Sequence, residues 1–216
     1  MRIDRAGAPF LAGSLIPAAA CVLARRSRWA VPFLGLAACM ALFFRDPERM
    51  PPEDPDVVVA PADGRVVVAG VAAPGLAPAG EWQQVSVFLS PLDVHINRVP
   101  YGGELVRMVY TPGRFLPAYN AEAASENVRN ALWVRRGDRT VVFQQVVGVL
   151  ARRIVCRVQV GDRLETGQRF GLMKFGSRMD VFLPPSCRLV VQPGDRVRAG
   201  ESVVGRWAST SVRTPC

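Results

Sequence analysis

The sequence contains one histidine, His95, and one lysine, Lys174, among its 216 residues. It has no CxxC pair, and its five cysteines have no histidine partner at the spacing of a zinc site. A metal centre is therefore not expected, and the odd number of cysteines favours a reducing compartment. Beyond residue 45 the helical period of hydrophobic residues is also missing, except in a short stretch at 118–126. The body of the protein is therefore not expected to be a bundle of helices.

The charge is one-sided, because the formal net charge is +9 and every basic side chain except Lys174 is arginine. This balance suits an anionic partner, either nucleic acid or the phosphates of a membrane surface. The sequence shows no strand in which aromatic and basic residues alternate as in nucleic-acid-binding sheets. We therefore expect a membrane surface, and not nucleic acid, as the partner.

The amino-terminal 45 residues contain two apolar stretches, 6–24 and 29–44, on either side of the sequence RRSR. A helix needs about 20 apolar residues to cross a bilayer, so the first stretch is borderline and the second is short. Because the second follows directly behind the first, a membrane-associated helical hairpin over residues 1–45 is favoured over a cleaved signal peptide. A hairpin buried in a soluble core is the alternative. Arginines on both sides of the hairpin leave open whether it spans the membrane or lies in one leaflet.

The rest of the sequence is typical of strands joined by turns. Residues 46–56 are rich in proline and charge and are expected to be a linker. From residue 57 to 216, valine-rich and alternating segments such as VVVAPADGRVVVAG and WQQVSVFLS predict a β domain. Residues 160–171 and 193–205 share a Gly-Asp-Arg-x-x-x-Gly frame, which is found in hairpins of lipoyl and biotinyl domains. We therefore predict a mainly β fold, a compact sandwich or barrel with lipoyl-like hairpins.

Three residues could together perform acid–base and nucleophilic chemistry. His95 is the only side chain whose ordinary pKa lies near neutrality. Asp63 lies in the turn PADG, and Ser177 follows Gly176, whose carbonyl is unusually open to attack. Asp63, His95 and Ser177 thus form an available Ser/His/Asp set. On spacing alone, a structural His95 and a turn residue Asp63 are favoured over this catalytic interpretation.

At these same residues the sequence resembles the phosphatidylserine decarboxylases of the short bacterial and archaeal type. The matching segments occur in order and at compatible spacing over almost the whole chain: FFRDPER (43–49), PADGRV (61–66), FLSPLDVHINRVP (88–100), ENVRN (126–130) and KFGSRMDVFLP (174–184). The resemblance implies an enzyme, a carboxy-lyase that converts phosphatidylserine to phosphatidylethanolamine and carbon dioxide. It also implies a cell-membrane location, with the catalytic domain on the cytoplasmic side.

The resemblance further implies a precursor that cleaves itself between Gly176 and Ser177. In this family the serine hydroxyl attacks the preceding carbonyl, and elimination and hydrolysis convert the serine to a pyruvoyl group. By resemblance, His95 takes the serine proton and later reprotonates the product, while Asp63 orients the imidazole. Fragments 1–176 and 177–216 are expected to stay together as a heterodimer, and further oligomerisation is left open. The pyruvoyl group acts as the electron sink, so neither a metal nor pyridoxal phosphate is expected.

Two positions distinguish this chain from the long-form members of the family, and the second of them is typical of the short form. Long-form members carry a second histidine where this chain has Arg98. They also have Ser or Thr after the reactive serine, where short-form members and this chain have arginine, here Arg178. We expect Arg178 either to bind an anionic group of the substrate or to form an ion pair with Asp180.

Two other functions fit parts of the sequence. The repeated hairpins and the sequence LMKFG could describe a biotinyl- or lipoyl-type carrier that is modified at Lys174. Phe175 departs from the usual carrier motif, and a carrier has no use for PADG or DVHINR. A membrane-anchored structural protein with a basic surface is the other alternative, and it gives no role to Gly176 and Ser177.

Overall fold

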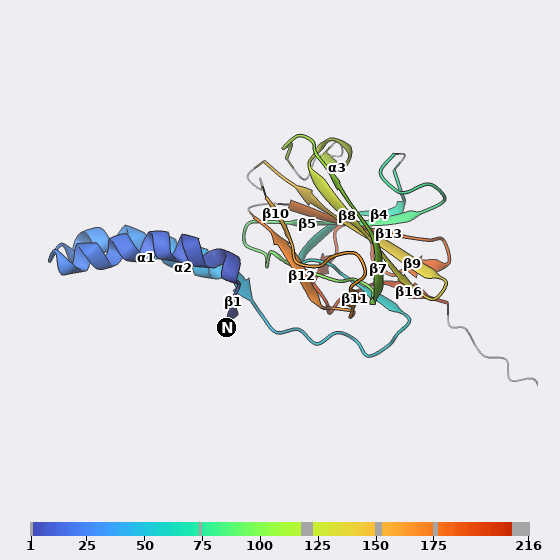
Figure 1. The fold of residues 1–216 in the computed structure, drawn as a ribbon, viewed down its shortest axis with the longest axis horizontal. Coiled ribbons are helices and arrows are strands. Elements are labelled where there is room, and N and C mark those ends of the chain that lie inside the picture. Colours follow the sequence, from blue (N-terminus) through green and yellow to red (C-terminus); the bar gives the residue numbers. More distant parts are fainter. Residues whose placement is uncertain (1, 74, 118–122, 150–152, 175–176, 209–216) are drawn as a thin grey trace, which may run out of the picture.

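The computed structural model describes residues 2–73, 75–117, 123–149, 153–174 and 177–208. Two helices, α1 (Ala8–Leu23) and α2 (Val31–Phe43), form a hairpin that projects from a body of strands (Figure 1). Short 3₁₀ helices η1 (Arg5–Gly7) and η2 (Ser27–Ala30) precede them, and the body contains one short helix, α3 (Ala123–Glu126). The predicted mainly β body behind an apolar helical hairpin is confirmed.

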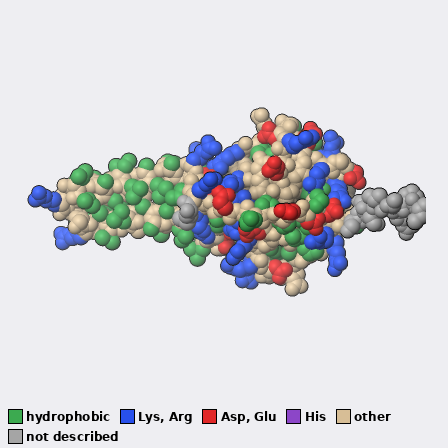
Figure 2. Space-filling view, turned by 90° about the horizontal axis from the view of Figure 1, so that it is seen from below, with side chains coloured by type: hydrophobic (Ala, Val, Ile, Leu, Met, Phe, Trp, Pro, Cys, Tyr) green, Lys and Arg blue, Asp and Glu red, His purple; other side chains and the backbone are tan. Residues whose placement is uncertain are grey.

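The helices of the hairpin begin at residues that favour helix starts. Asp4 caps η1 by accepting the backbone N–H of Ala6 at 2.8 Å, and both α1 and α2 carry a proline within their first two positions. Beyond the base, large apolar side chains face outward, and Leu23 is 84 % exposed. Figure 2 shows this apolar surface along the hairpin, with basic side chains at its tip. The helix from Arg5 to Leu23 is long and apolar enough to cross a membrane.

The largest sheet of the body has eight strands and curls around one side of the core. Its strands are, in spatial order, β11 (Arg163–Leu164), β7 (Gly103–Thr111), β8 (Arg129–Arg136), β9 (Arg139–Val147), β13 (Ser177–Leu183), β5 (Gln83–Leu89), β4 (Gly64–Val71) and β15 (Arg196–Val197). All neighbouring strands are antiparallel.

Smaller sheets close the other sides of the body. One has the order β10 (Ile154–Cys156), β12 (Arg169–Met173), β6 (Ile96–Arg98), and a second has the order β14 (Cys187–Leu189), β16 (Val203–Trp207), β3 (Val57–Val59). A two-stranded ribbon, β1 (Arg2–Ile3) with β2 (Arg45–Asp46), ties together the two ends of the helical hairpin.

The strand topology of the body is duplicated, and one repeat is inserted as a continuous segment within the other. Strands β6–β12 form one repeat, and β3–β5 together with β13–β16 form the other. Exchanging the repeats leaves the strand order of every sheet in the body unchanged: β11 replaces β15, β7 replaces β4, β8 replaces β5, β9 replaces β13, and β10-β12-β6 replaces β14-β16-β3. The two repeats therefore have equivalent ends, each formed by the same set of loops.

The two Gly-Asp-Arg segments lie at equivalent places in this duplication. Gly161 and Gly194 both adopt a left-handed backbone, with φ of 97° and 103°. Their N–H groups donate to the carbonyls of Leu105 and Val66, both at 2.8 Å. The predicted hairpins are thus present. One is hydrogen-bonded to β7 and the other to β4, which are equivalent strands of the large sheet.

The base of the hairpin is packed into the body. Phe43 and Phe44 form a hydrophobic cluster with Val94, Ile96 and Leu172, which come from the segment after β5, from β6 and from β12. The guanidinium of Arg157 binds both carboxylate oxygens of Asp4, at 2.7 and 2.6 Å. A separate, larger core fills the space inside the curled sheet.

Candidate active site

Ser177 is the first residue of β13, the strand at the centre of the large sheet. Its Cα partners are Leu89, the last residue of β5, and Val147, the last residue of β9. On the far side of β5, β4 begins at Gly64, and its next residue pairs with Phe88. The segment containing His95, the PADG turn and the start of β13 therefore meet at one end of the sheet.

The Ser177 side chain points toward the core. It lies on the same face of β13 as Met179 and Val181, both members of the core cluster, because side chains alternate along a strand. The residue is 0 % exposed, and its hydroxyl has no hydrogen-bond partner among the described residues. A buried, unpartnered hydroxyl costs stability, so it is more typical of a functional than of a structural serine. Gly176 lies outside the described residues.

His95 lies next to the end of β12, the strand that precedes β13 in the chain. It directly precedes β6, where Ile96 pairs with Leu172 of β12, and β12 ends at Met173, close to the start of β13 in the chain. The Nδ1 atom of His95 is 2.9 Å from the carbonyl oxygen of Asp93. Donation of Nδ1–H to that carbonyl makes Nε2 the basic nitrogen of the ring.

Burial keeps the imidazole of His95 neutral. The residue is 2 % exposed, and the ring of Phe43 lies 4.1 Å from it, centroid to centroid. Desolvation is the largest effect and lowers the pKa of His95 to about 4, although the Asp93 carbonyl and carboxylate act in the opposite direction. At neutral pH this side chain can therefore accept a proton.

Asp63 closes the PADG turn against two other segments. Its Oδ1 accepts the backbone N–H of Ala199, and its Oδ2 accepts a hydrogen bond from Arg49, both at 2.8 Å. Burial raises the pKa of Asp63, while the Ala199 N–H and Arg49 lower it in part. The described residues include no hydrogen bond between Asp63 and His95, whose Nδ1 is held by the Asp93 carbonyl instead. A catalytic role of Asp63 stays a prediction.

The arginines singled out from the sequence are both buried. Arg178 is 3 % exposed and donates to Asp180 at 2.6 Å and to Ser86 at 2.9 Å. The ion pair with Asp180 is thus present, on the face of β13 opposite to the Ser177 side chain; a contact of Arg178 with substrate stays a prediction. Arg98 donates to the carbonyls of Gly167 and Pro47, both at 2.9 Å, and so joins the linker to a repeated hairpin.

A chain of buried amides near Ser177 was not singled out from the sequence. The Nε2 of Gln145 donates to the Oδ1 of Asn97 at 2.8 Å, and Asn130 donates to the Oε1 of Gln145 at 3.4 Å. Gln145 pairs with Met179, so its side chain shares the core-facing side of the sheet with Ser177. The Nδ2 of Asn97 has no partner among the described residues. The available signal was that Asn97 and Asn130 lie in the segments HINR and ENVRN, among residues that alternate into the core.

Lys174 does not stand on an exposed tip. It is half-buried, and its Nζ lies 4.9 Å from the ring centroid of Phe10, at the base of the helical hairpin. A carrier presents its modified lysine freely to several partner sites, so this position offers little support for the carrier alternative.

Residues 36–205 match the family model described as phosphatidylserine decarboxylase. The chain belongs to the phosphatidylserine decarboxylase family. A relative from Symbiobacterium thermophilum is 46 % identical over 207 residues, which cover 94 % of this chain and 95 % of the relative. One from Mycolicibacterium smegmatis is 44 % identical over 210 residues, covering 94 % and 88 %. A third, from Pelodictyon phaeoclathratiforme, is 44 % identical over 175 residues, covering 80 % and 82 %.

Each of these three relatives is named a phosphatidylserine decarboxylase proenzyme. The family predicted from the sequence segments is thereby confirmed. The matched region of the family model extends from within α2 to β16, so it includes every segment that meets around Ser177 in this phosphatidylserine decarboxylase fold.

Proposed function

We propose that this protein decarboxylates phosphatidylserine to phosphatidylethanolamine and carbon dioxide, using a pyruvoyl group made from its own Ser177. The observation that carries the proposal is the buried hydroxyl of Ser177, which has no hydrogen-bond partner among the described residues, at the start of a central strand in a chain of this family. A pyruvoyl group fits there, because the Nδ2 of Asn97, in the buried amide chain on the core-facing side of the sheet, has no acceptor among the described residues. Once formed, the group would supply an electron sink for loss of the substrate carboxylate.

Maturation begins with attack of the Ser177 hydroxyl on the Gly176 carbonyl. His95, neutral at pH 7 because it is buried, accepts the hydroxyl proton, and the peptide bond becomes an ester. Removal of the Ser177 α-proton then breaks the bond between Cβ and the ester oxygen. This releases residues 1–176 with a free carboxylate and leaves dehydroalanine, which water converts to the pyruvoyl group and ammonia. In the decarboxylation step, His95 is the group that returns a proton to the α-carbon.

The fold explains how the two fragments would stay together after cleavage. Strand β13 pairs along its length with both β5 and β9, so fragment 177–216 contributes a central strand to a sheet built mainly by fragment 1–176. Cleavage before its first residue removes no pair of this ladder. The two fragments therefore form a heterodimer that is held by the same contacts as the precursor.

Intact mass and denaturing gels test the proposal. The wild-type protein should give two fragments, the smaller beginning at residue 177 without a free amine, and should release carbon dioxide from phosphatidylserine. Ser177→Ala should remain one chain without activity. Ser186→Ala is the matched control, because it removes an exposed serine from the same fragment and should mature normally. An uncleaved wild-type chain with full activity would contradict the pyruvoyl mechanism.

We also propose that the part of the helical hairpin farthest from the body, residues 16–36, anchors the enzyme in the cell membrane. The body would then lie on the cytoplasmic side. The outward-facing apolar side chains of α1 and α2 support the anchor, and the free thiols of Cys156 and Cys187 in the body fit a reducing compartment. Replacing residues 16–36 with a short flexible turn keeps the packed base. This variant should cleave itself but should no longer float with vesicles. Persistent flotation would show that another surface binds the membrane.

Protease accessibility tests the side. In membrane vesicles turned inside out, added trypsin should digest the body, whereas in intact spheroplasts the body should be protected. The opposite pattern would contradict the cytoplasmic location.

A further inference from the structure

The two repeats differ in charge at equivalent positions near their ends. In one repeat Arg196 of β15 pairs with Arg65 of β4, and in the other Arg163 of β11 pairs with Glu104 of β7. In both repeats the next cross-strand pair joins an apolar residue to a glycine, Val197 to Gly64 and Leu164 to Gly103. The two arginine-containing pairs therefore occupy equivalent positions. Two residues after the shared arginine, the first repeat has Arg198, whereas the second has Glu165. At two equivalent positions, therefore, one repeat has the acidic residues Glu104 and Glu165, and the other has the basic residues Arg65 and Arg198.

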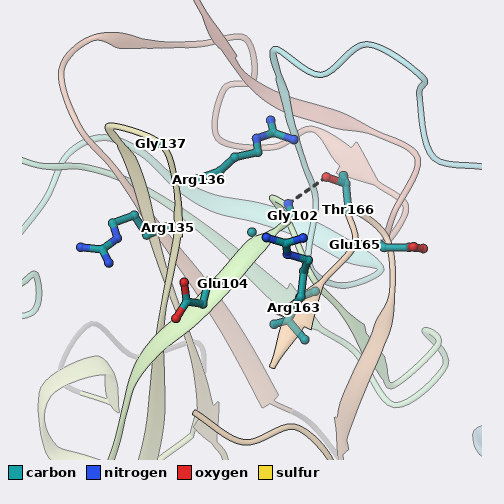
Figure 3. A pocket seen from close by; sticks show the side chains of 10 residues that line it. Gly102, Glu104, Arg135, Arg136, Gly137, Arg163, Glu165 and Thr166 are labelled. Atoms are coloured by element: carbon teal, nitrogen blue, oxygen red, sulfur yellow. Dashed lines mark hydrogen bonds between the residues drawn. The ribbon is translucent and has the colours of Figure 1, made fainter. Parts of the chain in front are cut away.

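The end without the catalytic segments has carboxylates, Glu104 and Glu165, at the two positions that differ between the repeats. A cavity of about 770 Å³ there is lined by Arg135, Arg136 and Arg163 but also by Glu104 and Glu165. Figure 3 shows Glu104 on the side of Arg135 and Arg163 and Glu165 pointing away from them, with the loops joined by a hydrogen bond from the N–H of Gly102 to the hydroxyl of Thr166, at 2.9 Å. At this end Glu104 lies opposite an arginine on each neighbouring strand, Arg163 on β11 and Arg135 on β8.

The end that carries Asp63 and the loop after β5 has arginines, Arg65 and Arg198, at both of the positions that differ. A cavity of about 520 Å³ is lined by Arg45, Arg196 and Arg198, together with Asp63 and Asp93. Asp63 is already bound to Arg49 and to the N–H of Ala199, and Asp93 accepts the N–H of Ser90 at 2.9 Å.

Among the ion pairs of the described residues there is none that involves Arg45, Arg65, Arg196 or Arg198. Like charges placed directly opposite each other on neighbouring strands are destabilising. Because the equivalent pair in the other repeat has opposite charges, the fold does not require the repulsion between Arg65 and Arg196.

We propose that this cavity binds the phosphate of the lipid headgroup while the serine moiety reaches residue 177. Arginine guanidinium groups match phosphate oxygens in a two-point geometry. Across the sheet, Arg65 pairs with Phe88, and Phe88 pairs with Arg178, the neighbour of Ser177. Strands in a sheet lie about 4.8 Å apart, so β4 begins roughly 10 Å from residue 177. The inference rests on the proposed decarboxylation and names the part of the substrate that this cavity would hold.

The cavity also lies at the level where a bilayer lipid would present its phosphate. Arg45 follows the end of α2, and its guanidinium donates to the carbonyls of Leu42 and Leu92, both at 2.7 Å. It therefore connects the base of the apolar hairpin to the loop after β5. A lipid whose tails lie beside the hairpin would have its headgroup next to Arg45.

Charge reversal with a matched control tests the inference. Arg198→Glu introduces the residue type that the other repeat has at this position. Arg163→Glu makes the same charge change at the other end, directly opposite Glu104, so it is the more severe change for the fold. Decarboxylation is measured against the surface concentration of phosphatidylserine in neutral detergent micelles. Arg198→Glu should raise KM about tenfold or more, the effect expected from loss of a charged hydrogen bond. Arg163→Glu should stay within twofold of wild type, and both variants should cleave between Gly176 and Ser177 like wild type.

Competitors distinguish the source of the phosphate. Glycerophosphoserine, which has the headgroup without tails, should inhibit wild type more strongly than Arg198→Glu. Inhibition by inorganic phosphate without inhibition by glycerophosphoserine would assign the cavity to free phosphate and overturn the proposal. A normal KM for Arg198→Glu, or an equal loss in Arg163→Glu, would overturn it as well. By contrast, a wild-type protein that cleaves itself but leaves phosphatidylserine intact would refute the proposed function, whatever these variants do.

Discussion

The depressed pKa of His95 makes a prediction about acid conditions that an exposed histidine would not make. A solvent-exposed catalytic histidine loses its basic form below about pH 6.5, so self-cleavage would slow there. Because burial lowers the pKa of His95 to about 4, the folded precursor should keep its base down to about pH 5. The self-cleavage rate should therefore be nearly constant between pH 7.5 and about pH 5.

The same burial should make the fold sensitive to acid. In the unfolded chain His95 binds a proton near pH 6.5, whereas in the folded protein it does so only near pH 4. The unfolded state thus holds more protons between these values, and the free energy of unfolding falls with falling pH by about 1.4 kcal/mol per pH unit. By pH 4 the loss from this residue amounts to about 3 kcal/mol, which is a large part of the stability of a typical domain.

Two measurements, one on the wild-type precursor and one on an uncleavable variant, separate these effects. Cleavage is followed by gel after a shift to each pH, and stability is followed by urea unfolding of Ser177→Ala, which stays one chain. His95→Gln in that background removes the titrating group and should lessen the fall of stability below pH 6.5. A cleavage rate that halves near pH 6.5 while the fold stays intact would refute the buried, neutral base.

Three other perturbations test neighbouring contacts. Phe43→Ala should cost about 3–5 kcal/mol of stability and admit water to the imidazole, so the cleavage rate should become pH-dependent near pH 6; an unchanged pH profile would contradict this. Arg178→Ala strands the buried carboxylate of Asp180 and should cost about 3–5 kcal/mol, measured by urea unfolding. Replacing both partners with leucine should recover most of that loss, and a raised KM in this double variant would reveal a substrate contact. Lys174→Arg keeps a cation over Phe10 and should preserve maturation and activity, whereas loss of function with a modified Lys174 in the wild type would favour a carrier.

Much of the fold could be predicted because local patterns and tertiary structure agree. The apolar stretches at 6–24 and 29–44 predicted the two helices, and the alternation in WQQVSVFLS predicted β5. The repeated Gly-Asp-Arg frame predicted equivalent hairpins, since a left-handed glycine at the turn leaves a clear signal in the sequence. The full duplication was not predicted. Most equivalent strands of the two repeats occupy equivalent positions in the sheet but have no sequence motif in common.

The candidate site was predictable only where a motif marked it. Ser177 and His95 stand in segments that resemble the family, and the structure adds their burial and the register that brings their segments together. The hydrogen bond from His95 to the Asp93 carbonyl could not be predicted, because it depends on how a loop folds back on itself. The Asn97–Gln145 contact joins two different sheets, and no local pattern specifies such a pair.

The packing of the hairpin base suggests why the anchor and the chemistry belong to one structure. Phe43 ends α2 and contacts His95, and the same cluster includes Leu172 on the strand that leads toward Ser177. The apolar side chains that exclude water from the imidazole of His95 also lower its pKa. They are thus continuous with those of the proposed membrane anchor. Deleting residues 1–45 as a whole would expose His95 as well as remove the anchor. We therefore propose that the anchor proper begins within the hairpin, distal to Phe10 and Phe43, and that these two residues belong with the catalytic body; the predicted boundary at residue 45 stays a prediction.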